Sequence, residues 1–515
     1  MNRTSFGDLS IFVKDNIEKT KEEFLKNISK EIIDKVEIIG KYINVYFKKD
    51  YLIKEAEKIN YEIEFRNELA KLNDGKTMVI DYSAPNIAKP FGIGHLRSTN
   101  IGQAIYNIYK ILGWNCIGDN HLGDYGTQFG KLIVAIKKWS KKDLDKMTIE
   151  DLEALYVKFH ENETDELLNE ARGWFLKLEE KNEEAVEIWQ KCVDISMVEF
   201  NQVYDLLDVH IDYTLGESFY QDKMEEVIKT MIDKGITKES QGATIVEFAD
   251  KTVELVKKSN LSTTYFDRDI ATIKYRMDTW NPDLMIYEVG ADQNLYFKHV
   301  FETAKMMGWD KCQYYHVGHG LIRWKDGKFS TRKGDTIHLS EIIDKTIEMA
   351  RNIAPENDEE TIKNIAIGAL KFNDLSQDPK KDVIFDWERI MNLSGDSGPY
   401  LQYTYARANS VLKKTEIKEQ KNINPDSVVL NEEELELLRD FIKFKNKIIE
   451  AADRFNPGVL AEYLLIVARK YNSFYDKHRI IGEKEEDFRI FLTKTMSSIL
   501  HLGLELLGIK TVDKM

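Results

Sequence analysis

The feature that most constrains the fold of this chain is a strand, a glycine-containing loop and an amphipathic helix in direct succession at residues 77–113. The run "TMVID" at 77–81 has the apolar character of a short buried strand. Apolar residues then recur at helical spacing, at Ile101, Ala104, Ile105, Ile108, Ile111 and Leu112. Gly113 fits a helix C-cap, and "NCIGDNHLGDYG" follows as a second strand and loop. Such a βαβ unit predicts a parallel sheet, hence an α/β fold.

The loop before that helix, within "NIAKPFGIGHLRST" at 86–99, concentrates residues that suit an anion. A glycine-containing turn at a helix N-terminus exposes backbone N–H groups, and the helix dipole adds partial positive charge. Gly92 and Gly94 let a ligand approach the backbone, while Lys89 and His95 add donors for phosphate oxygens. Taken alone, the stretch also fits an ordinary βα turn with a surface lysine and histidine, so both interpretations stay open.

A second basic cluster, "KDGKFSTRKG", occupies residues 325–334 after a β-type run. A polar loop of this kind can close over a triphosphate and neutralise charge that develops during displacement. The alternative is a solvated basic turn. The residues in question are Lys328, Ser330, Thr331, Arg332 and Lys333.

The remaining sequence divides by composition. Residues 1–74 have the pattern of a small α+β piece that ends at the turn signal "NDGK". A charged, mostly helical stretch at about 138–240 interrupts the β-type runs and is interpreted as an insertion. From 386 to 515 the pattern is nearly all helical and predicts a bundle.

Composition and charge exclude several classes of protein. The net charge of −15 argues mildly against a nucleic-acid partner, although a local cluster of basic residues is enough for phosphate contacts. Cys116, Cys192 and Cys312 are far apart, so neither a disulfide framework nor a cysteine-rich zinc site is expected. No apolar run is long enough for a signal peptide or a membrane span, which favours a cytoplasmic protein.

Taken together, the two clusters resemble the signatures of the class I aminoacyl-tRNA synthetases, and within them the arginyl-tRNA synthetases. "SAPNIAKPFGIGHLRST" is similar to the family's HIGH-type motif and "FSTRKG" to its KMSKS-type loop. "HLGDYGTQFG" resembles the loop that follows the HIGH-type motif. "GESFY", "STTYFDRDIATIKYR" and "ADQNLYFKHVFE" resemble its arginine-pocket segments. "SGPYLQYTYARA" and "LGLELLGIKTVDKM" resemble its anticodon-binding domain. The motifs occur in the family's order from about residue 75 onward.

The resemblance implies a Rossmann-type catalytic domain at 75–385 with a helical insertion, then an α-helical anticodon-binding domain at 386–515. The implied reaction is attachment of L-arginine to tRNA(Arg) through an arginyl-adenylate, with ATP and Mg²⁺ and without protein-bound zinc. Lys89, His95 and Lys328 would be catalytic. ATP would be bound by Gly92, Gly94, His95, Ser330, Thr331 and Lys333.

The substrate pocket follows from the chemistry of a guanidinium, a permanently charged planar fork that requires carboxylates. By similarity, Glu217 and Asp269 would hold the guanidinium and Tyr265 would pack beside it. Asp81, Asn86 and Gln293 would take the α-amino end. Without the family match, these residues also fit cap, surface and core positions.

In the predicted bundle, Tyr400, Tyr403 and Arg407 share a helix that also has an apolar side. Aromatic and arginine side chains stack on unpaired bases, so these residues are candidates for tRNA contact. The alternative is a helix core with one arginine whose charged end reaches solvent.

Four departures from the family pattern stand out. Gly92 replaces the first signature histidine, and Thr331 replaces the second lysine of the KMSKS-type loop, a loss for which Lys89 would compensate. Asp81 stands where a longer glutamate is common. The piece at 1–74 is shorter than the family's additional domain, which touches the tRNA elbow.

Two other functions were weighed: another nucleotidyl-transferring ligase of the superfamily acting on a small acid, and a non-catalytic RNA-binding relative. The helical C-terminal region argues against the first, and the presence of Lys89, His95 and Lys328 argues against the second. No editing domain is expected, because arginine has few close analogues of equal charge and shape. The protein is expected to be a monomer.

Overall fold

The βαβ unit that the sequence predicts is part of a four-stranded parallel sheet. The structure is a computed structural model that describes residues 7–29, 31–257, 264–325, 338–415 and 423–515. The strands lie in the order β10–β9–β4–β5 and all pair in parallel. They are β4 (Thr77–Asp81), β5 (Asn115–Asp119), β9 (Leu284–Gly290) and β10 (Gln313–His319). The predicted α/β class is therefore confirmed.

The connections of this sheet create a crevice at its carboxyl edge. The chain passes from β4 to β5 through α4 (Ile93–Ile111), and from β9 to β10 on the other side through α11 (Asn294–Met306). Because the two connections diverge between β4 and β9, the carboxyl ends of these strands border the position where open α/β sheets bind ligands. Asp81 lies opposite Asp119 in the register, so two acidic side chains end neighbouring strands there.

Helix α4 packs unusually close to the chain that leaves β4. A Cβ atom added to Gly102 would lie 2.3 Å from Cβ of Tyr82, which itself is fully buried. The apolar stripe predicted for this helix is buried against the sheet, including Ile101, Ala104, Ile105 and Ile108. Gly102 therefore allows α4 to lie close to the sheet, and this distance also sets the position of the turn at the N-terminus of α4.

A long segment, residues 120–283, separates β5 from β9 in the sequence and is called the excursion below. Its helices are α5 (Thr127–Trp139), α6 (Ile149–Glu161), α7 (Asp165–Glu179), α8 (Glu183–Leu207) and α9 (Met224–Asp233), with short 3₁₀ segments η1 (Leu144–Lys146) and η2 (Glu217–Lys223). An antiparallel sheet follows, made of β6 (Thr237–Ser240), β7 (Ala243–Glu247) and β8 (Val253–Lys257). Residues 243–249, "ATIVEFA", have a β-rich composition, and they contain β7, so this segment belongs to the small antiparallel sheet and not to the parallel one. Helix α10 (Tyr265–Trp280) then leads back to β9.

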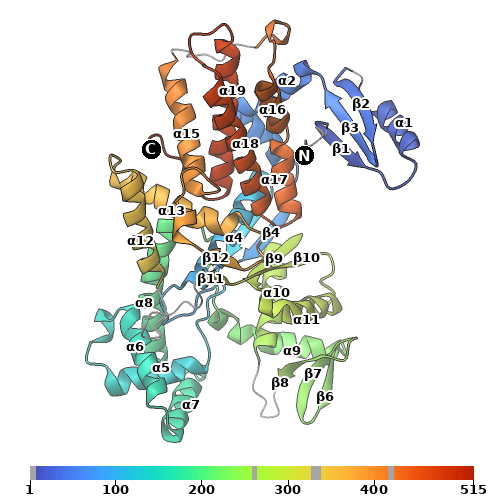
Figure 1. Cartoon of the computed structure of the whole chain (residues 1–515). Coiled ribbons are helices and arrows are strands. Elements are labelled where there is room, and N and C mark those ends of the chain that lie inside the picture. Colours follow the sequence, from blue (N-terminus) through green and yellow to red (C-terminus); the bar gives the residue numbers. More distant parts are fainter. Residues whose placement is uncertain (1–6, 30, 258–263, 326–337, 416–422) are drawn as a thin grey trace.

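The C-terminal part is helical, and Figure 1 shows its helices above the parallel sheet, with the excursion below. Two short strands, β11 (Ile322–Trp324) and β12 (Val383–Phe385), pair with each other in parallel. In the sequence they are separated by α12 (Leu339–Ile353) and α13 (Glu359–Leu375). The helices after them are α14 (Trp387–Ile390), α15 (Gly398–Lys414), α16 (Glu432–Phe441), α17 (Phe444–Asp453), α18 (Gly458–Lys477) and α19 (Glu486–Leu506), with the 3₁₀ segment η4 (Pro425–Ser427) between α15 and α16.

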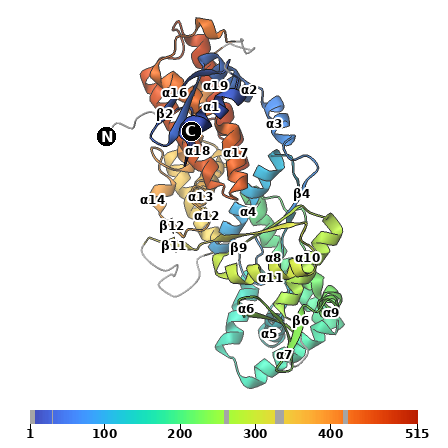
Figure 2. The same ribbon diagram turned by 90° about the vertical axis from the view of Figure 1, so that its right-hand side faces the viewer.

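The bundle and the sheet share one hydrophobic core. Tyr315 of β10 stacks on Phe455, which follows α17, with ring centroids 3.8 Å apart. The buried ammonium of Lys371 on α13 donates hydrogen bonds to the carbonyls of Leu207, at the end of α8, and Gly508, after α19. Figure 2 shows the resulting continuous, elongated body. No helix among the described residues has the length and apolar character needed to cross a bilayer.

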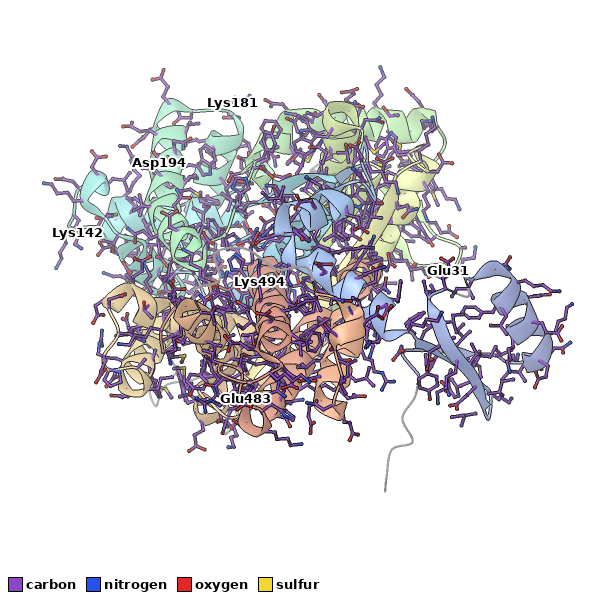
Figure 3. The ribbon with its side chains drawn as sticks, turned by 90° about the horizontal axis from the view of Figure 1, so that it is seen from above. Glu31, Lys142, Lys181, Asp194, Glu483 and Lys494 are labelled. Carbon is purple, nitrogen blue, oxygen red and sulfur yellow. The ribbon has the colours of Figure 1, made fainter. Side chains whose placement is uncertain are left out.

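The first residues form a separate small unit. Strands β1 (Leu9–Phe12), β2 (Ile33–Ile39) and β3 (Tyr42–Phe47) make an antiparallel sheet in the order β1–β3–β2, covered by α1 (Ile17–Asn27). Helices α2 (Lys49–Asn60) and α3 (Glu62–Ala70) join it to β4. Figure 3 shows the unit, marked by Glu31, standing away from the rest of the molecule.

The close approach of α4 leads to a stability prediction. Gly102→Ala should destabilise the protein by about 1–3 kcal/mol, because α4 or Tyr82 must move to admit the methyl group. Gly173→Ala is the matched control on the exposed face of α7, where an added Cβ would have no neighbour within 4 Å. That change should be neutral or stabilising by up to about 1 kcal/mol, since alanine favours a helix. Thermal unfolding of both variants measures the difference; equal midpoints would contradict the close packing.

Candidate active site

The glycine-containing turn lies at the carboxyl end of β4 and is held in place by α8. Ser83, Ala84 and Ala88 have positive φ angles of 73°, 45° and 62°, which only a well-supported loop maintains. Two of its backbone N–H groups donate to α8: Ala88 to Ser196 Oγ and Phe91 to Glu199 Oε1, both at 2.9 Å. The long helix of the excursion therefore positions the turn, a role that the sequence analysis did not assign to it.

His95 has a defined protonation state at this turn. Its Nδ1 accepts a hydrogen bond from the Gly92 N–H at 3.1 Å. Burial, and secondarily the charge of Lys89, lowers the pKa of His95 to about 4. The ring is thus neutral at physiological pH, with its proton on Nε2, because Nδ1 is used as an acceptor. The exposed Gly94 and the Nε2–H group together offer donors suited to an anion.

A cavity of about 240 Å³ brings residues of the turn next to Tyr265, the first residue of α10. Asn86 and Lys89 of the turn line it together with Tyr265, which is distant from them in the sequence. Lys89 is exposed and its Nζ lies 5.7 Å from the centre of the Tyr156 ring. The predicted phosphate side and the predicted arginine side of the site therefore meet around one cavity.

Arg276 of α10 joins the two acidic strand ends. Its Nη2 lies 2.6 Å from Asp81 Oδ2 and 2.8 Å from Asp119 Oδ2, and its guanidinium is fully buried. Burial raises the pKa of Asp119 to about 6 in spite of the opposing effect of Arg276. Asp81, predicted to take the α-amino group of arginine, thus already carries an ion pair through one of its oxygens.

The two carboxylates predicted for a guanidinium lie on α10 and η2. Asp269 accepts a hydrogen bond from the Tyr296 hydroxyl, and burial raises its pKa to about 6. Burial raises the pKa of Glu217 to about 7, and Arg268 opposes this with an ion pair at 2.9 Å. Tyr265 is 62% exposed at the start of α10, on the helix face that also carries Asp269.

The remaining predicted residues fall into three groups. Gln293 is exposed at the end of the 3₁₀ segment η3 (Ala291–Gln293), directly after β9. Lys328, Ser330, Thr331 and Lys333 fall in 326–337, outside the described residues. Tyr400, Tyr403 and Arg407 lie on α15 in the bundle, and the structure does not bring them to the turn.

On α15 these three residues form a half-buried cluster with α18. Arg407 Nη1 donates to Asn472 Oδ1 at 2.8 Å, and its guanidinium lies about equally far from two rings, 4.9 Å from that of Tyr403 and 5.0 Å from that of Tyr475. Asn472 also donates to the Tyr400 hydroxyl at 2.9 Å. The cluster is thus ordered from within, with aromatic faces fixed beside a cation.

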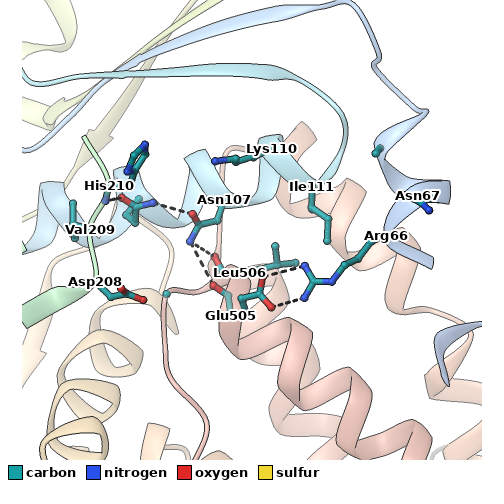
Figure 4. A pocket seen from close by; sticks show the side chains of 13 residues that line it. Arg66, Asn67, Asn107, Lys110, Ile111, Asp208, Val209, His210, Glu505 and Leu506 are labelled. Atoms are coloured by element: carbon teal, nitrogen blue, oxygen red, sulfur yellow. Dashed lines mark hydrogen bonds and ion pairs between the residues drawn. The ribbon is translucent and has the colours of Figure 1, made fainter. Parts of the chain in front are cut away.

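A larger cavity of about 590 Å³ lies away from this site, toward the other end of α4 (Figure 4). It is bordered by Asn107 and Lys110 of α4, by Arg66 of α3 and by Glu505 of α19. Nearby, Glu62, His501 and Glu505 are the group among the described residues with a spacing that could hold a metal ion. Arg66 already pairs with both carboxylates, so this group has its own cation.

Comparison with known proteins identifies the family. Residues 58–387 match the family described as tRNA synthetases class I (R), catalytic domain, and residues 401–515 match the DALR anticodon binding domain. A protein of Clostridium kluyveri named "Arginine--tRNA ligase" is 41% identical over 515 aligned positions, covering 96% of this chain and 90% of that protein.

The chain belongs to the arginyl-tRNA synthetases of class I. This confirms the resemblance seen in the sequence. A Clostridium botulinum protein of the same printed name is 40% identical, with the same coverage of 96% and 90%. The solved arginyl-tRNA synthetase of Plasmodium falciparum has a TM-score of 0.81 at 26% identity, covering 96% of this chain and 89% of that one. The Thermus thermophilus arginyl-tRNA synthetase, at 20% identity, shows the same fold with a TM-score of 0.84, covering 97% and 92%.

The buried ion pairs of Arg276 give a prediction with a pH dependence. Arg276→Met leaves two adjacent buried carboxylates without their cation and should destabilise the protein by about 3–5 kcal/mol near pH 8. In the wild type, burial already raises the pKa of Asp119 to about 6 although Arg276 opposes the shift, so loss of Arg276 raises this pKa further. A group whose folded-state pKa is raised costs stability at high pH, and this penalty shrinks as pH falls through the raised pKa, which in the variant lies above about 6.

Urea unfolding at pH 8 and at pH 5.5 measures both effects. Arg172→Met is the control, because Arg172 is exposed on α7 and donates only to Asn169 among the described residues. A pH-independent loss in Arg276→Met would mean that packing, not charge, is the role of Arg276.

Proposed function

We propose that this chain attaches L-arginine to tRNA(Arg) in an ATP-dependent reaction that passes through arginyl-adenylate. The observation that carries the proposal is the cavity at which Lys89, from an anion-binding turn, meets Tyr265, from the helix that carries Asp269. This neighbourhood supports an anion site for the triphosphate beside an acidic site for a guanidinium, as joining arginine to ATP requires.

In the first step a carboxylate oxygen of arginine attacks the α-phosphorus of ATP, and the bond to pyrophosphate breaks. ATP enters with Mg²⁺ on its phosphate oxygens as the substrate complex. In the second step a hydroxyl of the terminal ribose of tRNA attacks the arginyl carbonyl and AMP leaves. Both steps depend on positioning and on stabilisation of charge.

The chain's own residues are suited to this role without forming a covalent intermediate. The neutral His95 donates Nε2–H, and Lys89, Gly92 and Gly94 contribute to phosphate binding. Lys328 of the KMSKS-type loop acts with them by similarity to the family, although it lies outside the described residues. Burial raises the pKa values of the Cys116 and Cys192 thiols to about 12, so neither is a thiolate nucleophile.

Arginine lies between Glu217 and Asp269 with its guanidinium, and Tyr265 covers it. Asp81, Asn86 and Gln293 surround the α-amino end. The half-buried cluster of Tyr400, Tyr403 and Arg407 on α15 contacts tRNA, because ordered aromatic faces and a fixed cation suit unpaired bases. The protein acts as a cytoplasmic monomer.

Pyrophosphate exchange and tRNA charging with each of the twenty amino acids test the proposal. Arginine alone should support both reactions, with exchange measured in the presence and absence of tRNA. Exchange with another small acid and without tRNA charging would indicate a different ligase. Binding of tRNA without either reaction would indicate a non-catalytic relative.

Asp269→Asn tests the guanidinium site. A charge-assisted hydrogen bond at a buried site contributes about 1.5–3 kcal/mol, so the KM for arginine should rise about tenfold or more. The KM for ATP should remain unchanged. Asp278→Asn is the control, because Asp278 pairs with Lys274 on the same helix at 2.6 Å but lies on its exposed side. Arginine kinetics equal to those of the wild type would remove Asp269 from the pocket.

Lys89→Ala tests the proposed charge stabilisation. Loss of one preorganised group should lower kcat by roughly 10²–10³. The KM for ATP should change little, because the lysine acts in the transition state. Adding Thr331→Lys should restore part of the rate. Lys158→Ala is the control, since Lys158 is another exposed lysine whose Nζ lies over a ring, 5.4 Å from the centre of Trp139. A Lys89→Ala rate within about threefold of the wild type would show that the lysine is only a surface residue.

A further inference from the structure

An arginine of the chain itself lies in the site that we assign to the substrate's guanidinium. Arg268 Nη1 lies 2.9 Å from Glu217 Oε2. The Gln221 amide, with its oxygen turned toward the guanidinium, accepts from Nε at 3.1 Å and from Nη2 at 3.2 Å. The rings of Tyr265 and Tyr125 lie 5.2 and 5.9 Å from the same guanidinium carbon.

These contacts fix Arg268 in place. Nη1 of the guanidinium contacts Glu217, and Nε and Nη2 contact Gln221. Both rings lie within the range of a cation–π contact. The residue is also buried, with only 8% of its surface exposed. Such a guanidinium is a permanent part of the pocket, in contrast to a side chain that moves aside when substrate enters.

The backbone that carries Glu217 is fixed as well. The Asp124 carboxylate accepts from the Ser218 N–H at 2.8 Å and from the Ser218 hydroxyl at 2.6 Å. Gly216 makes this approach possible, because a Cβ there would lie 2.4 Å from Asp124 Oδ2. Asp124 therefore fixes the start of η2, and Arg268 fixes the side chain that projects from it.

Glu217 keeps one oxygen for another partner. Arg268 uses Oε2, and within the described ranges Oε1 has no hydrogen bond or ion pair. A carboxylate accepts bonds at both oxygens, so it can bind two guanidinium groups at once. An Arg268-bound Glu217 is thus already oriented for a second guanidinium.

We propose that Arg268 is a positioning residue for arginine recognition, holding the Glu217 carboxylate ionised and turned so that its second oxygen receives the guanidinium of the substrate. The inference rests on the proposed function, because it requires Glu217 to bind arginine. It adds a cation of the chain to a pocket for which the sequence suggested only carboxylates and a tyrosine.

The electrostatics of the pocket make such a cation necessary. The charged groups that face Glu217 are Arg268 and Asp269 from α10 and Asp124 from the loop after β5. Burial and the two carboxylates raise the pKa of Glu217, and Arg268 alone among these groups lowers it, leaving it at about 7. On η2 itself, Asp222 pairs with Lys181 and Lys223 donates to the Phe219 carbonyl, so both are engaged elsewhere. Without Arg268, Glu217 would be protonated at neutral pH and unable to bind a cation well.

The test is the dissociation constant of L-arginine, measured by calorimetry on the full chain between about pH 6 and pH 8.5. Arginine binds the ionised carboxylate, so in the wild type the constant should fall as pH rises and level off above about 7. In Arg268→Gln the pH at which binding levels off should move up by about one unit or more, which makes binding at pH 7 about fivefold weaker or more, because a smaller fraction of Glu217 is ionised there. The two proteins should converge toward pH 8.5.

Three further variants complete the design. Arg268→Lys keeps the positive charge but lacks the planar guanidinium, so the pH at which its arginine binding changes should lie between the values for the wild type and Arg268→Gln. This variant replaces Arg268→Gln in the test if the glutamine variant fails to fold. Glu217→Gln should bind arginine weakly and without an inflection near neutral pH. Arg172→Gln on the exposed face of α7 should match the wild type.

The outcomes separate this inference from the proposed function. Loss of arginine binding in Glu217→Gln together with an unshifted inflection in the Arg268 variants would overturn the role of Arg268 alone. So would tighter binding in Arg268→Gln, or a loss that is equal at every pH. A wild-type protein that binds no arginine, or a Glu217→Gln variant that binds it normally, would instead overturn the proposed site.

Discussion

The buried guanidinium of Arg276 is the interaction on which the rest of the site depends. It contacts carboxylates at the ends of β4 and β5, at 2.6 and 2.8 Å, and so closes the carboxyl edge of the sheet from the side of α10. Two adjacent buried carboxylates repel each other, and a single fully buried cation between them makes their proximity tolerable. Because Arg276 belongs to α10, the same contact fixes the helix that carries Tyr265, Arg268 and Asp269.

A second constraint acts on the phosphate side. The turn before α4 contains non-glycine residues with positive φ, and the side chains of Ser196 and Glu199 on α8 satisfy its backbone donors. Helix α8 belongs to the excursion between β5 and β9, so the excursion supports the site in addition to extending the molecule. These contacts use the Ala88 and Phe91 donors to hold the turn in place. The donors that remain at the proposed anion site, those of Gly94 and His95, are therefore preorganised and need not rearrange during the reaction.

Much of this architecture follows from local pattern, and the remainder depends on tertiary contacts. The βαβ unit was predictable because the strand and helix periods are local, and Lys89 and His95 stood out because a glycine-containing turn precedes a helix. The pairing of Arg276 was not, since its partners Asp81 and Asp119 lie 195 and 157 residues away in the sequence. The contacts of Ser196 and Glu199 with the turn were not predictable either, because both residues occupy ordinary helix positions in the sequence. The sheet that residues 243–249, "ATIVEFA", would join was also not predictable, because β-rich composition does not specify the pairing partner. Arg268 lay inside a segment recognised as pocket-forming, yet its charge, equal to that of the substrate, gave no reason to include it.

In the proposed site, the anion-binding turn and the two acidic residues hold the two ends of one arginyl-adenylate. A crystal structure of the protein with a non-hydrolysable arginyl-adenylate analogue tests it most directly. We expect the phosphate-mimicking group at Gly92, Gly94 and His95, and the guanidinium between Asp269 and Glu217, with Arg268 still paired to Glu217. A guanidinium bound away from both carboxylates, or a nucleotide bound away from the turn, would contradict it.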